Sequence, residues 1–152
     1  MDYVCDVPGK APLPDTAWLD GAPPPGRKTW FLIETEAEAI RESALMGHAV
    51  EKHFRQAQAR AEASYVPPAG PFIEQQIGLK AHVRRTMPRF FTLRDPEGNG
   101  LATAMVPAGA GCPIIVGIGN RDPYVEHGEA IRVLAAHLGI PLDRGRCYPY
   151  GR

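Results

Sequence analysis

Apolar residues in the middle of the chain recur at the spacing of a buried helical stripe. Four of them follow one another at intervals of four, three and four positions: Val50, Phe54, Ala57 and Ala61. Such a stripe is typical of an amphipathic helix. Upstream, Thr35 and Glu38 have the spacing of a capping box, and helix-forming residues follow as far as Gly47. The pattern predicts two consecutive helices, which break at Gly47 and end near Ala63.

Beyond residue 88 the apolar pattern changes to that of strands. Segment 89–94 is rich in aromatic and β-branched residues and segment 95–100 is dense in turn formers, so residues 89–106 are predicted to form a hairpin. Segment 113–118 is predicted to be a third strand, buried on both faces. Residues 30–33 form a short strand or lead into the first helix, and residues 72–82 favour a short helix.

A last helix is predicted from Asp122 to Gly139, with the aspartate as its cap, Pro123 in its first turn and the glycine at its end. This order favours an α+β fold, in which a three-stranded antiparallel meander packs against two or three helices. We expect one domain over 1–152: an extended Pro/Gly-rich arm (1–27), a globular core (28–140) and an irregular tail (141–152). The arm packs on its own domain, which we favour, or docks on a partner.

Composition narrows the range of partners. Seventeen basic residues balance seventeen acidic ones, so no net charge draws the whole chain to nucleic acid or to a membrane. No apolar run reaches the length of a membrane span, and no secretory signal pattern is seen. The three cysteines (Cys5, Cys112 and Cys147) have the spacing of neither a disulfide framework nor a metal site. We expect a cytoplasmic protein without a metal or other cofactor.

Three residues form the candidate catalytic group: His48, Arg94 and Asp95. His48 stands at a predicted helix start, where an imidazole can act as an acid or a base, or can cap the helix or pack on the hairpin. Arg94 and Asp95 end a strand just before the turn. The guanidinium suits a carboxylate or a phosphate, and the aspartate either orients His48 or belongs to the turn itself.

The end of the third predicted strand supplies a candidate ligand-binding group: Gly117, Gly119 and Asn120. Two glycines and an asparagine permit positive φ and can present amide donors to an anion. We expect the His48 imidazole, the Arg94 guanidinium and the Asn120 carboxamide to meet in space, because the meander folds back over the middle helix.

The basic segment 80–94 is the candidate contact for nucleic acid, with four leading residues: Lys80, Arg84, Arg85 and Arg89. If these side chains share one edge, they form a modest patch that faces phosphates. Phe90 and Phe91 are adjacent in a predicted strand, so one of them can point outward and stack on a base. The alternative, which we favour, is a solvated surface beside a buried aromatic residue.

Several short strings stand in order along the chain: Glu42, Met46-Gly47-His48-Ala49-Val50, Phe91-Thr92-Leu93-Arg94-Asp95-Pro96-Glu97-Gly98, Ala102-Thr103 and Gly117-Ile118-Gly119-Asn120. Over roughly residues 35–137 they resemble the PcfJ-like domain of plasmids and phages. That pattern has cysteine, glutamine and lysine where this chain has Ala49, Ile114 and Ile118. Exchanging a thiol, an amide and an amine for hydrocarbon removes hydrogen-bonding groups while it keeps the fold. The resemblance implies a phage or mobile-element setting and a member with a less reactive site.

These observations favour a small, non-catalytic interaction module of phage or mobile-element origin, which binds a protein partner through the hairpin edge and the proline-rich arm. Two alternatives stay open. One is an enzyme, or a nucleotide- or phosphate-binding domain, that uses His48, Arg94, Asp95 and Asn120. The other is nucleic-acid binding through the 80–94 segment.

Overall fold

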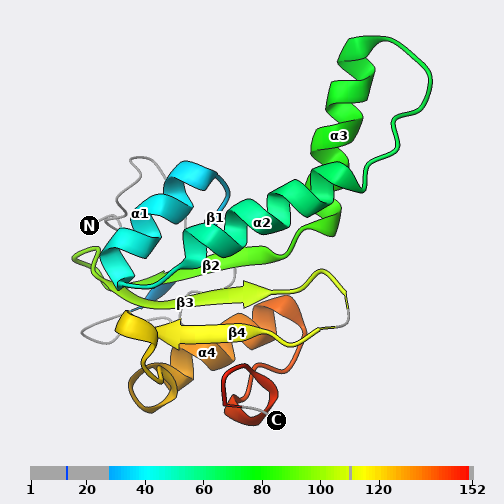
Figure 1. Ribbon diagram of the computed structural model, residues 1–152. Coiled ribbons are helices and arrows are strands. Elements are labelled where there is room, and N and C mark those ends of the chain that lie inside the picture. The colour runs from blue at the N-terminus through cyan, green and yellow to red at the C-terminus, as the bar shows by residue number, and fades with distance from the viewer. Residues whose placement is uncertain (1–12, 14–27, 110, 151–152) are drawn as a thin grey trace.

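The computed structural model describes residue 13, residues 28–109 and residues 111–150. Within these ranges the main elements follow the order β1 (Thr29–Ile33), α1 (Glu36–Met46), α2 (Val50–Ala63), α3 (Phe72–Thr86), β2 (Arg89–Arg94), β3 (Gly100–Val106), β4 (Ile114–Gly117) and α4 (Tyr124–Leu138) (Figure 1). Short 3₁₀ turns at Ile118–Asn120 and Arg144–Arg146 follow β4 and α4. The fold is α+β, as the sequence predicts.

The sheet has four antiparallel strands in the order β1-β2-β3-β4. The predicted three-stranded meander is therefore wrong in its strand number, because residues 29–33 pair with β2 as a fourth strand. The chain forms α1, α2 and α3 between these two segments, so no turn residues signal their pairing as they do for the β2–β3 hairpin. Both β2 and β3 are interior strands, and the hairpin offers no free edge to a protein partner.

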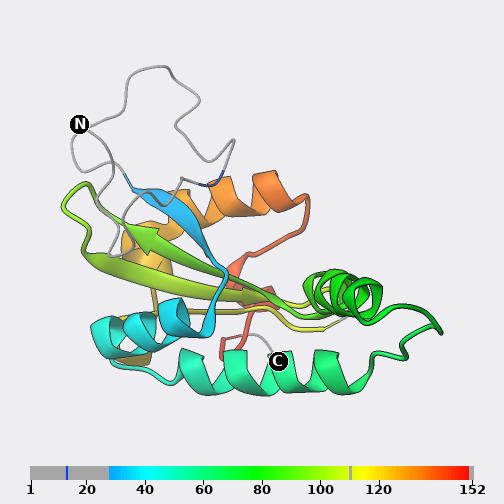
Figure 2. The same cartoon turned by 90° about the horizontal axis from the view of Figure 1, so that it is seen from above.

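Helices cover both faces of the sheet, with α1 and α2 on one side and α4 on the other (Figure 2). The α4 face is apolar. Alternate strand residues there, including Trp30, Phe91, Leu93, Ala104 and Ile115, pack with Ala130, Ile131 and Leu134 of α4. On the opposite face Phe90 packs with Val50 and Phe54 of α2. Phe90 and Phe91 are each 1% exposed, so the expectation that one of them points outward to stack on a base is wrong.

The first two helices form as predicted. Thr35 Oγ1 accepts a hydrogen bond from the Glu38 amide at 3.1 Å, which satisfies one of the unpaired N–H groups at the start of α1. Gly47 ends α1 in the left-handed conformation (φ +66°), which an L side chain rarely adopts. The predicted stripe of α2 is buried at Val50, Phe54 and Ala61.

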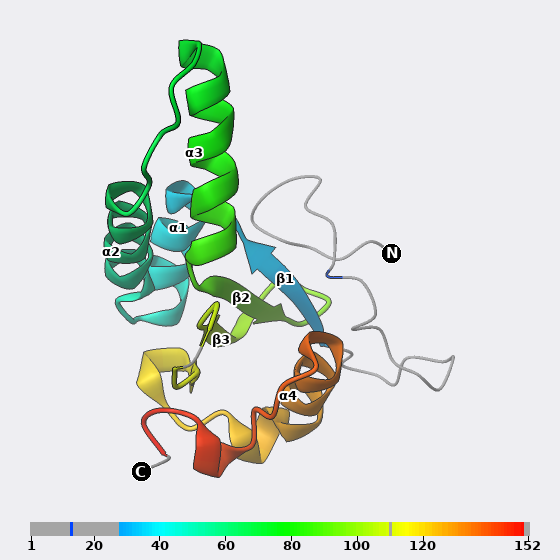
Figure 3. The same cartoon turned by 90° about the vertical axis from the view of Figure 1, so that its right-hand side faces the viewer.

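The third helix and the last strand differ from the prediction. α3 is longer than residues 72–82, contains no buried residue and projects beyond the end of the sheet (Figures 1 and 3). The prediction that the last strand is buried on both faces is wrong. Ile115 is fully buried on the α4 side, whereas Ile114 and Val116 are half-buried and line an open cavity.

Two ends of the described chain lie against the sheet. The Leu13 N–H donates to the Trp30 carbonyl at 2.8 Å, so at this residue the arm packs on its own domain. The rest of the predicted arm lies outside the described residues. In the tail, Tyr148 forms a parallel bridge with Ile114, and its N–H donates to the Pro113 carbonyl at 2.8 Å. These two contacts join the tail to the strand β4 and its approach at Tyr148.

The last helix begins and ends close to the predicted residues. Asp122 Oδ1 accepts from the Tyr124 amide at 2.9 Å, and Pro123 stands just before the first helical residue instead of within the first turn. Gly139 ends the helix at φ +70°. None of the described helices is long and apolar enough to cross a membrane.

Candidate functional site

Four polar side chains are joined by hydrogen bonds between α1 and the sheet: Arg94, Glu42, Thr103 and His48. Arg94 Nη2 donates to Glu42 Oε1 at 2.9 Å, and the Thr103 hydroxyl donates to Glu42 Oε2. His48 Nε2 lies 2.8 Å from the same hydroxyl oxygen. The network connects α1, the end of β2, the middle of β3 and the turn before α2.

The charged part of this network is fully enclosed. The side chains of Arg94 and Glu42 are 2% and 1% exposed. Arg94 also donates from Nε to Thr92 Oγ1 at 3.0 Å and from Nη1 to the Gly98 carbonyl at 3.2 Å. A buried charge is tolerated when its remaining hydrogen-bonding groups are satisfied in this way. We expected Arg94 to hold a carboxylate or phosphate, and here it holds a carboxylate of its own chain.

The directions of the hydrogen bonds assign the tautomer of His48. Because Thr103 gives its proton to Glu42, its oxygen accepts from His48, and Nε2 therefore carries a proton. Nδ1 accepts from the Val50 amide at 3.3 Å, near the start of α2. Both ring nitrogens have partners within the protein, and the ring is neutral.

The electrostatic surroundings agree with a neutral ring. Burial lowers the pKa of His48 below its ordinary 6.5, and His53 lowers it further. The Glu42 carboxylate and a backbone hydrogen bond raise the pKa of His48 by less than these effects lower it. The imidazole is consequently uncharged at neutral pH.

Asp95 does not take the predicted role of orienting His48, which Thr103 and Glu42 perform instead. Its Oδ1 accepts from the amides of Glu97 (3.0 Å) and Asn99 (2.9 Å), and its Oδ2 accepts from the Asn99 side chain. Burial raises the pKa of Asp95, but these hydrogen bonds outweigh it and leave the pKa below 3.8. Asp95 thus organises the β2–β3 turn, the alternative role that the turn sequence indicated.

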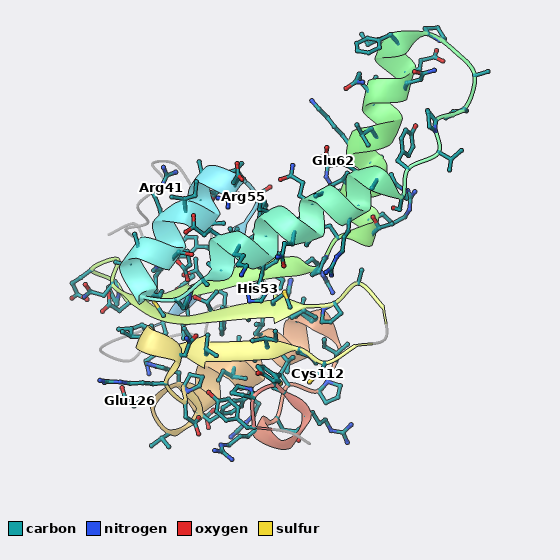
Figure 4. All side chains as sticks on the ribbon, in the orientation of Figure 1. Arg41, His53, Arg55, Glu62, Cys112 and Glu126 are labelled. Carbon is teal, nitrogen blue, oxygen red and sulfur yellow. The ribbon has the colours of Figure 1, made fainter. Side chains whose placement is uncertain are left out.

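A cavity of about 410 Å³ opens beside His48. Its lining comes from the start of α2, the adjacent face of the sheet, the turn after β4 and the tail: His48, Ala49, Val50, His53, Phe90, Thr103, Met105, Ile114, Val116, Asn120, Tyr148 and Pro149. Figure 4 shows His53, a residue of α2, on the side of this helix that faces the strands. No Asp, Glu, Lys or Arg belongs to this described lining. The cavity is therefore mainly apolar, with a few polar groups that include two histidines.

Two of the three groups that we expected to meet line one cavity. His48 and Asn120 both line the cavity, whereas the Arg94 guanidinium is enclosed behind Glu42 and Thr103 and does not. Sequence reasoning did not place His53 and Tyr148 at the site, and it named Glu42 and Thr103 only through a family resemblance, without a role. Glu42 lies on the same helical face as Ala39 and Met46, which is the signal of a buried carboxylate.

The predicted anion-binding group is only partly at the cavity. The Gly117 amide is used inside the loop, because it donates to the Arg121 carbonyl at 2.7 Å. Gly119 and Asn120 have positive φ (+61° and +64°), as the glycine–asparagine pattern indicated. Only Asn120 of the three lines the cavity.

The basic segment divides between several places. Lys80, Arg84 and Arg89 line a groove of about 420 Å³ between α2, α3 and the end of β1. Arg85 Nη2 lies instead 3.5 Å from His82 Nδ1, and Arg94 is buried at the far end of β2. The segment is not one continuous patch.

Comparison with known proteins gives no relative: no family model matches the chain, and neither a curated protein nor a solved structure matches it significantly. The PcfJ-like resemblance stays a prediction. Two of the three positions that depart from that pattern, Ala49 and Ile114, line the cavity, and the third, Ile118, is 52% exposed. In the described residues no group of three or more His, Cys, Asp or Glu is arranged to hold a metal ion.

Proposed function

We propose that the protein is a non-catalytic binding module whose cavity beside His48 receives a small, planar and uncharged ligand. The observation that carries this proposal is the lining, which combines apolar walls with a few polar groups and has no Asp, Glu, Lys or Arg among its described residues. A volume of about 410 Å³ lies in the ordinary range for small-molecule sites.

The polar groups of the lining favour a ring with hydrogen-bonding edges. The carboxamide of Asn120 offers both donors and an acceptor, while Phe90, Met105 and Val116 supply apolar surface. A neutral heterocycle, such as a nucleobase, matches a wall of this kind. A phosphate group matches it less well, since no Lys or Arg stands beside it in the described lining.

The state of His48 supports binding over proton transfer. Its Nε2–H donates to Thr103 and its Nδ1 accepts from Val50, so either form of acid–base work requires one of these bonds to break. The PcfJ-like pattern has a thiol and an amide at the positions of Ala49 and Ile114, and both of these residues line the cavity. Their replacement by hydrocarbon fits a site that holds a ligand without transforming it.

The direct test is a binding titration that follows backbone amide shifts by NMR, with adenine, cytosine, indole and benzimidazole as probes. We expect saturable shifts around the cavity for at least one probe. Ile114→Glu places a carboxylate in the cavity and should weaken that probe roughly tenfold or more. Val125→Glu, at a position 90% exposed on α4, is the matched control and should change nothing. Absence of saturable shifts, or equal binding by Ile114→Glu, contradicts the proposal.

The enzyme or phosphate-binding alternative makes a different prediction. It requires a phosphate to reach Arg94, and therefore to displace the Glu42 carboxylate from an enclosed pair. Inorganic phosphate and adenosine monophosphate should then bind more tightly than adenine, and Glu42→Gln should alter that preference. The proposed neutral site predicts that adenosine monophosphate binds no better than adenine.

A second candidate function is the binding of a protein partner, and α3 is the feature that favours it. Phe72, Ile73 and Ile77 are 74%, 69% and 63% exposed on this projecting helix. Exposed apolar residues in a row commonly mark protein interfaces. Replacing Ile73 and Ile77 by Gln should abolish complex formation with such a partner and leave the cavity titration unchanged, whereas a complex that persists argues against α3 as the interface.

A further inference from the structure

One face of α3 is held by its own chain. The Tyr65 ring lies 5.3 Å from the His82 ring, and Ser64 Oγ lies 2.7 Å from His82 Nε2. Tyr65 also covers Gly78, where an added Cβ would meet its hydroxyl oxygen at 2.3 Å. These contacts fix the loop after α2 on the back of the helix. The opposite face of the helix points away from Tyr65 and His82.

That opposite face, which we name the α3 front, combines apolar and basic residues. Its members lie within about half a turn of the helical wheel: Phe72, Ile73, Gln76, Ile77, Leu79, Lys80, Val83 and Arg84. The half of the front nearer Phe72 is strongly exposed and apolar. The half nearer the sheet forms one wall of the groove of about 420 Å³ and carries Lys80 and Arg84. An apolar surface therefore continues into a basic groove.

The groove has an apolar floor and cations without internal partners. Leu32, Ile33 and Phe54 contribute to its lining, together with the exposed side chains of Lys80, Arg84 and Arg89. Among the described residues, none of these three cations forms an ion pair. Four other exposed arginines do, namely Arg55 with Glu36, Arg132 with Glu129, Arg144 with Asp122 and Arg146 with Asp143, whereas Arg60, Arg85 and Arg121 form no ion pair with a described residue.

We propose that the α3 front and its groove dock an acidic amphipathic helix of a protein partner. Apolar residues of that helix pack on Ile73, Ile77 and the groove floor, and its carboxylates pair with Lys80, Arg84 and Arg89. Such a helix lies along α3, which is 15 residues long and so spans about 22 Å. The proposal names the partner class for the second candidate function and is independent of the cavity beside His48.

Charge complementarity also decides against the other occupants. A nucleic acid needs stacking rings beside a continuous cationic track, but Phe54 of the groove is 3% exposed and the exposed Phe72 does not line the groove. Glu34 and Glu62 also interrupt the three cations of the groove lining. Figure 4 shows Glu62 near the junction of α2 and α3. A symmetric contact with a second copy would bring Lys80 and Arg84 close to the same cations of the partner, which is unfavourable.

The test is selection from a displayed library of random peptides of about 15 residues, the length of α3. The full chain is the bait, and Lys80→Glu/Arg84→Glu is the parallel bait. Lys52→Glu/Arg132→Glu makes the same change of net charge at exposed positions outside the groove and is the matched control. We expect enrichment of sequences with apolar residues at helical spacing and flanking Asp or Glu, on the natural chain and the control but not on the groove variant.

Binding of one enriched peptide is then measured by fluorescence polarisation. The groove variant should weaken the peptide roughly tenfold or more, and Ile77→Gln should weaken it while Val125→Gln does not. Ile114→Glu should leave it unchanged, so failure here is separable from failure of the cavity proposal. Lack of enrichment, enriched peptides without acidic residues, or equal affinity for the groove variant overturns the proposal. So does tighter binding of a thymidine oligonucleotide or of phosphatidylglycerol vesicles, or self-association through α3.

Discussion

The two faces of the sheet are built on different principles. On the α4 face, Leu93, Ile115 and Leu134 are fully buried among other apolar side chains, and the buried Trp30 indole donates to the Ala130 carbonyl at 2.8 Å. On the α1 face, a buried ion pair and two buried threonines lie beside the apolar cluster around Phe90. An apolar face tolerates the exchange of one apolar side chain for another of similar volume, whereas a polar network loses stability when any one of its hydrogen-bonding groups is removed.

This difference separates what holds the fold from what holds the candidate site. The α4 face stabilises the fold by burying apolar side chains, and few of its residues line the cavity. The α1 face places His48 at the cavity through Thr103, so a change beneath α1 alters stability and the site together.

The largest expected effect comes from breaking the buried ion pair. Arg94→Met leaves the Glu42 carboxylate buried without its cation, and we expect a loss of about 3–5 kcal/mol in the free energy of unfolding. Urea unfolding followed by circular dichroism measures it. Combining Arg94→Met with Glu42→Leu should restore most of the loss, because no unpaired charge remains. A double variant as unstable as the single one would mean that the pair contributes more than charge balance.

The matching change on the other face is Leu134→Ala. This fully buried residue of α4 should lose about 2–5 kcal/mol through the cavity it leaves. Unlike the ion-pair variant, it should leave the ring signals of His48 in the NMR spectrum where they were. Displaced His48 signals in Leu134→Ala would show that the two faces are not independent.

Thr103→Val is a smaller and more selective change. It removes the hydroxyl that links His48 to Glu42, so the buried Glu42 and the half-buried His48 each lose a partner while the side-chain volume is nearly kept. We expect a cost of about 1–3 kcal/mol in unfolding free energy, together with a change in the pKa of His48. Thr92→Val, which removes one bond to Arg94 but none to His48, is the control for the second effect. A pKa change of the same size in both variants would argue against the assigned link.

The smallest expected effect is a dependence of stability on pH. The folded protein holds the pKa of His48 below 6.5, its value in the unfolded chain, and burial likewise lowers the pKa of His127. At a pH between the folded and the unfolded pKa of His48, the unfolded chain binds more protons than the folded protein does. The free energy of unfolding therefore has its full value above pH 6.5 and falls as the pH decreases from 6.5 towards the folded pKa. Unfolding midpoints at about pH 7.5 and about pH 5.5 should differ less in His48→Gln than in the natural chain. His137→Gln is the control.

Local patterns predicted the parts of the fold that neighbouring residues determine. The stripe of α2, the left-handed ends at Gly47 and Gly139 and the β2–β3 turn at Asp95 all follow from short-range rules. The pairing of β1 with β2 joins segments on either side of three helices, and no local signal marks it. The predicted role of Asp95 beside His48 fails for a related reason, since the turn offers its carboxylate closer donors.

The candidate site is harder to predict because its parts come from distant elements. Glu42 and Thr103 meet only once α1 lies on β3, and the cavity also needs the tail residue Tyr148 to reach the sheet. Of the three groups that the sequence was expected to bring together, His48 and Asn120 line the same cavity, whereas the Arg94 guanidinium is enclosed. Whether a strand side chain is enclosed or reaches the cavity depends on which helix covers that part of the sheet.

The most direct test of the account is an NMR titration of the His48 ring nitrogens. We predict the Nε2–H tautomer at neutral pH, a pKa below 6.5 and a shift of that pKa in Thr103→Val but not in Thr92→Val. An Nδ1–H tautomer, or a pKa at or above 6.5, would contradict the network from Arg94 to His48 on which the proposed binding site depends.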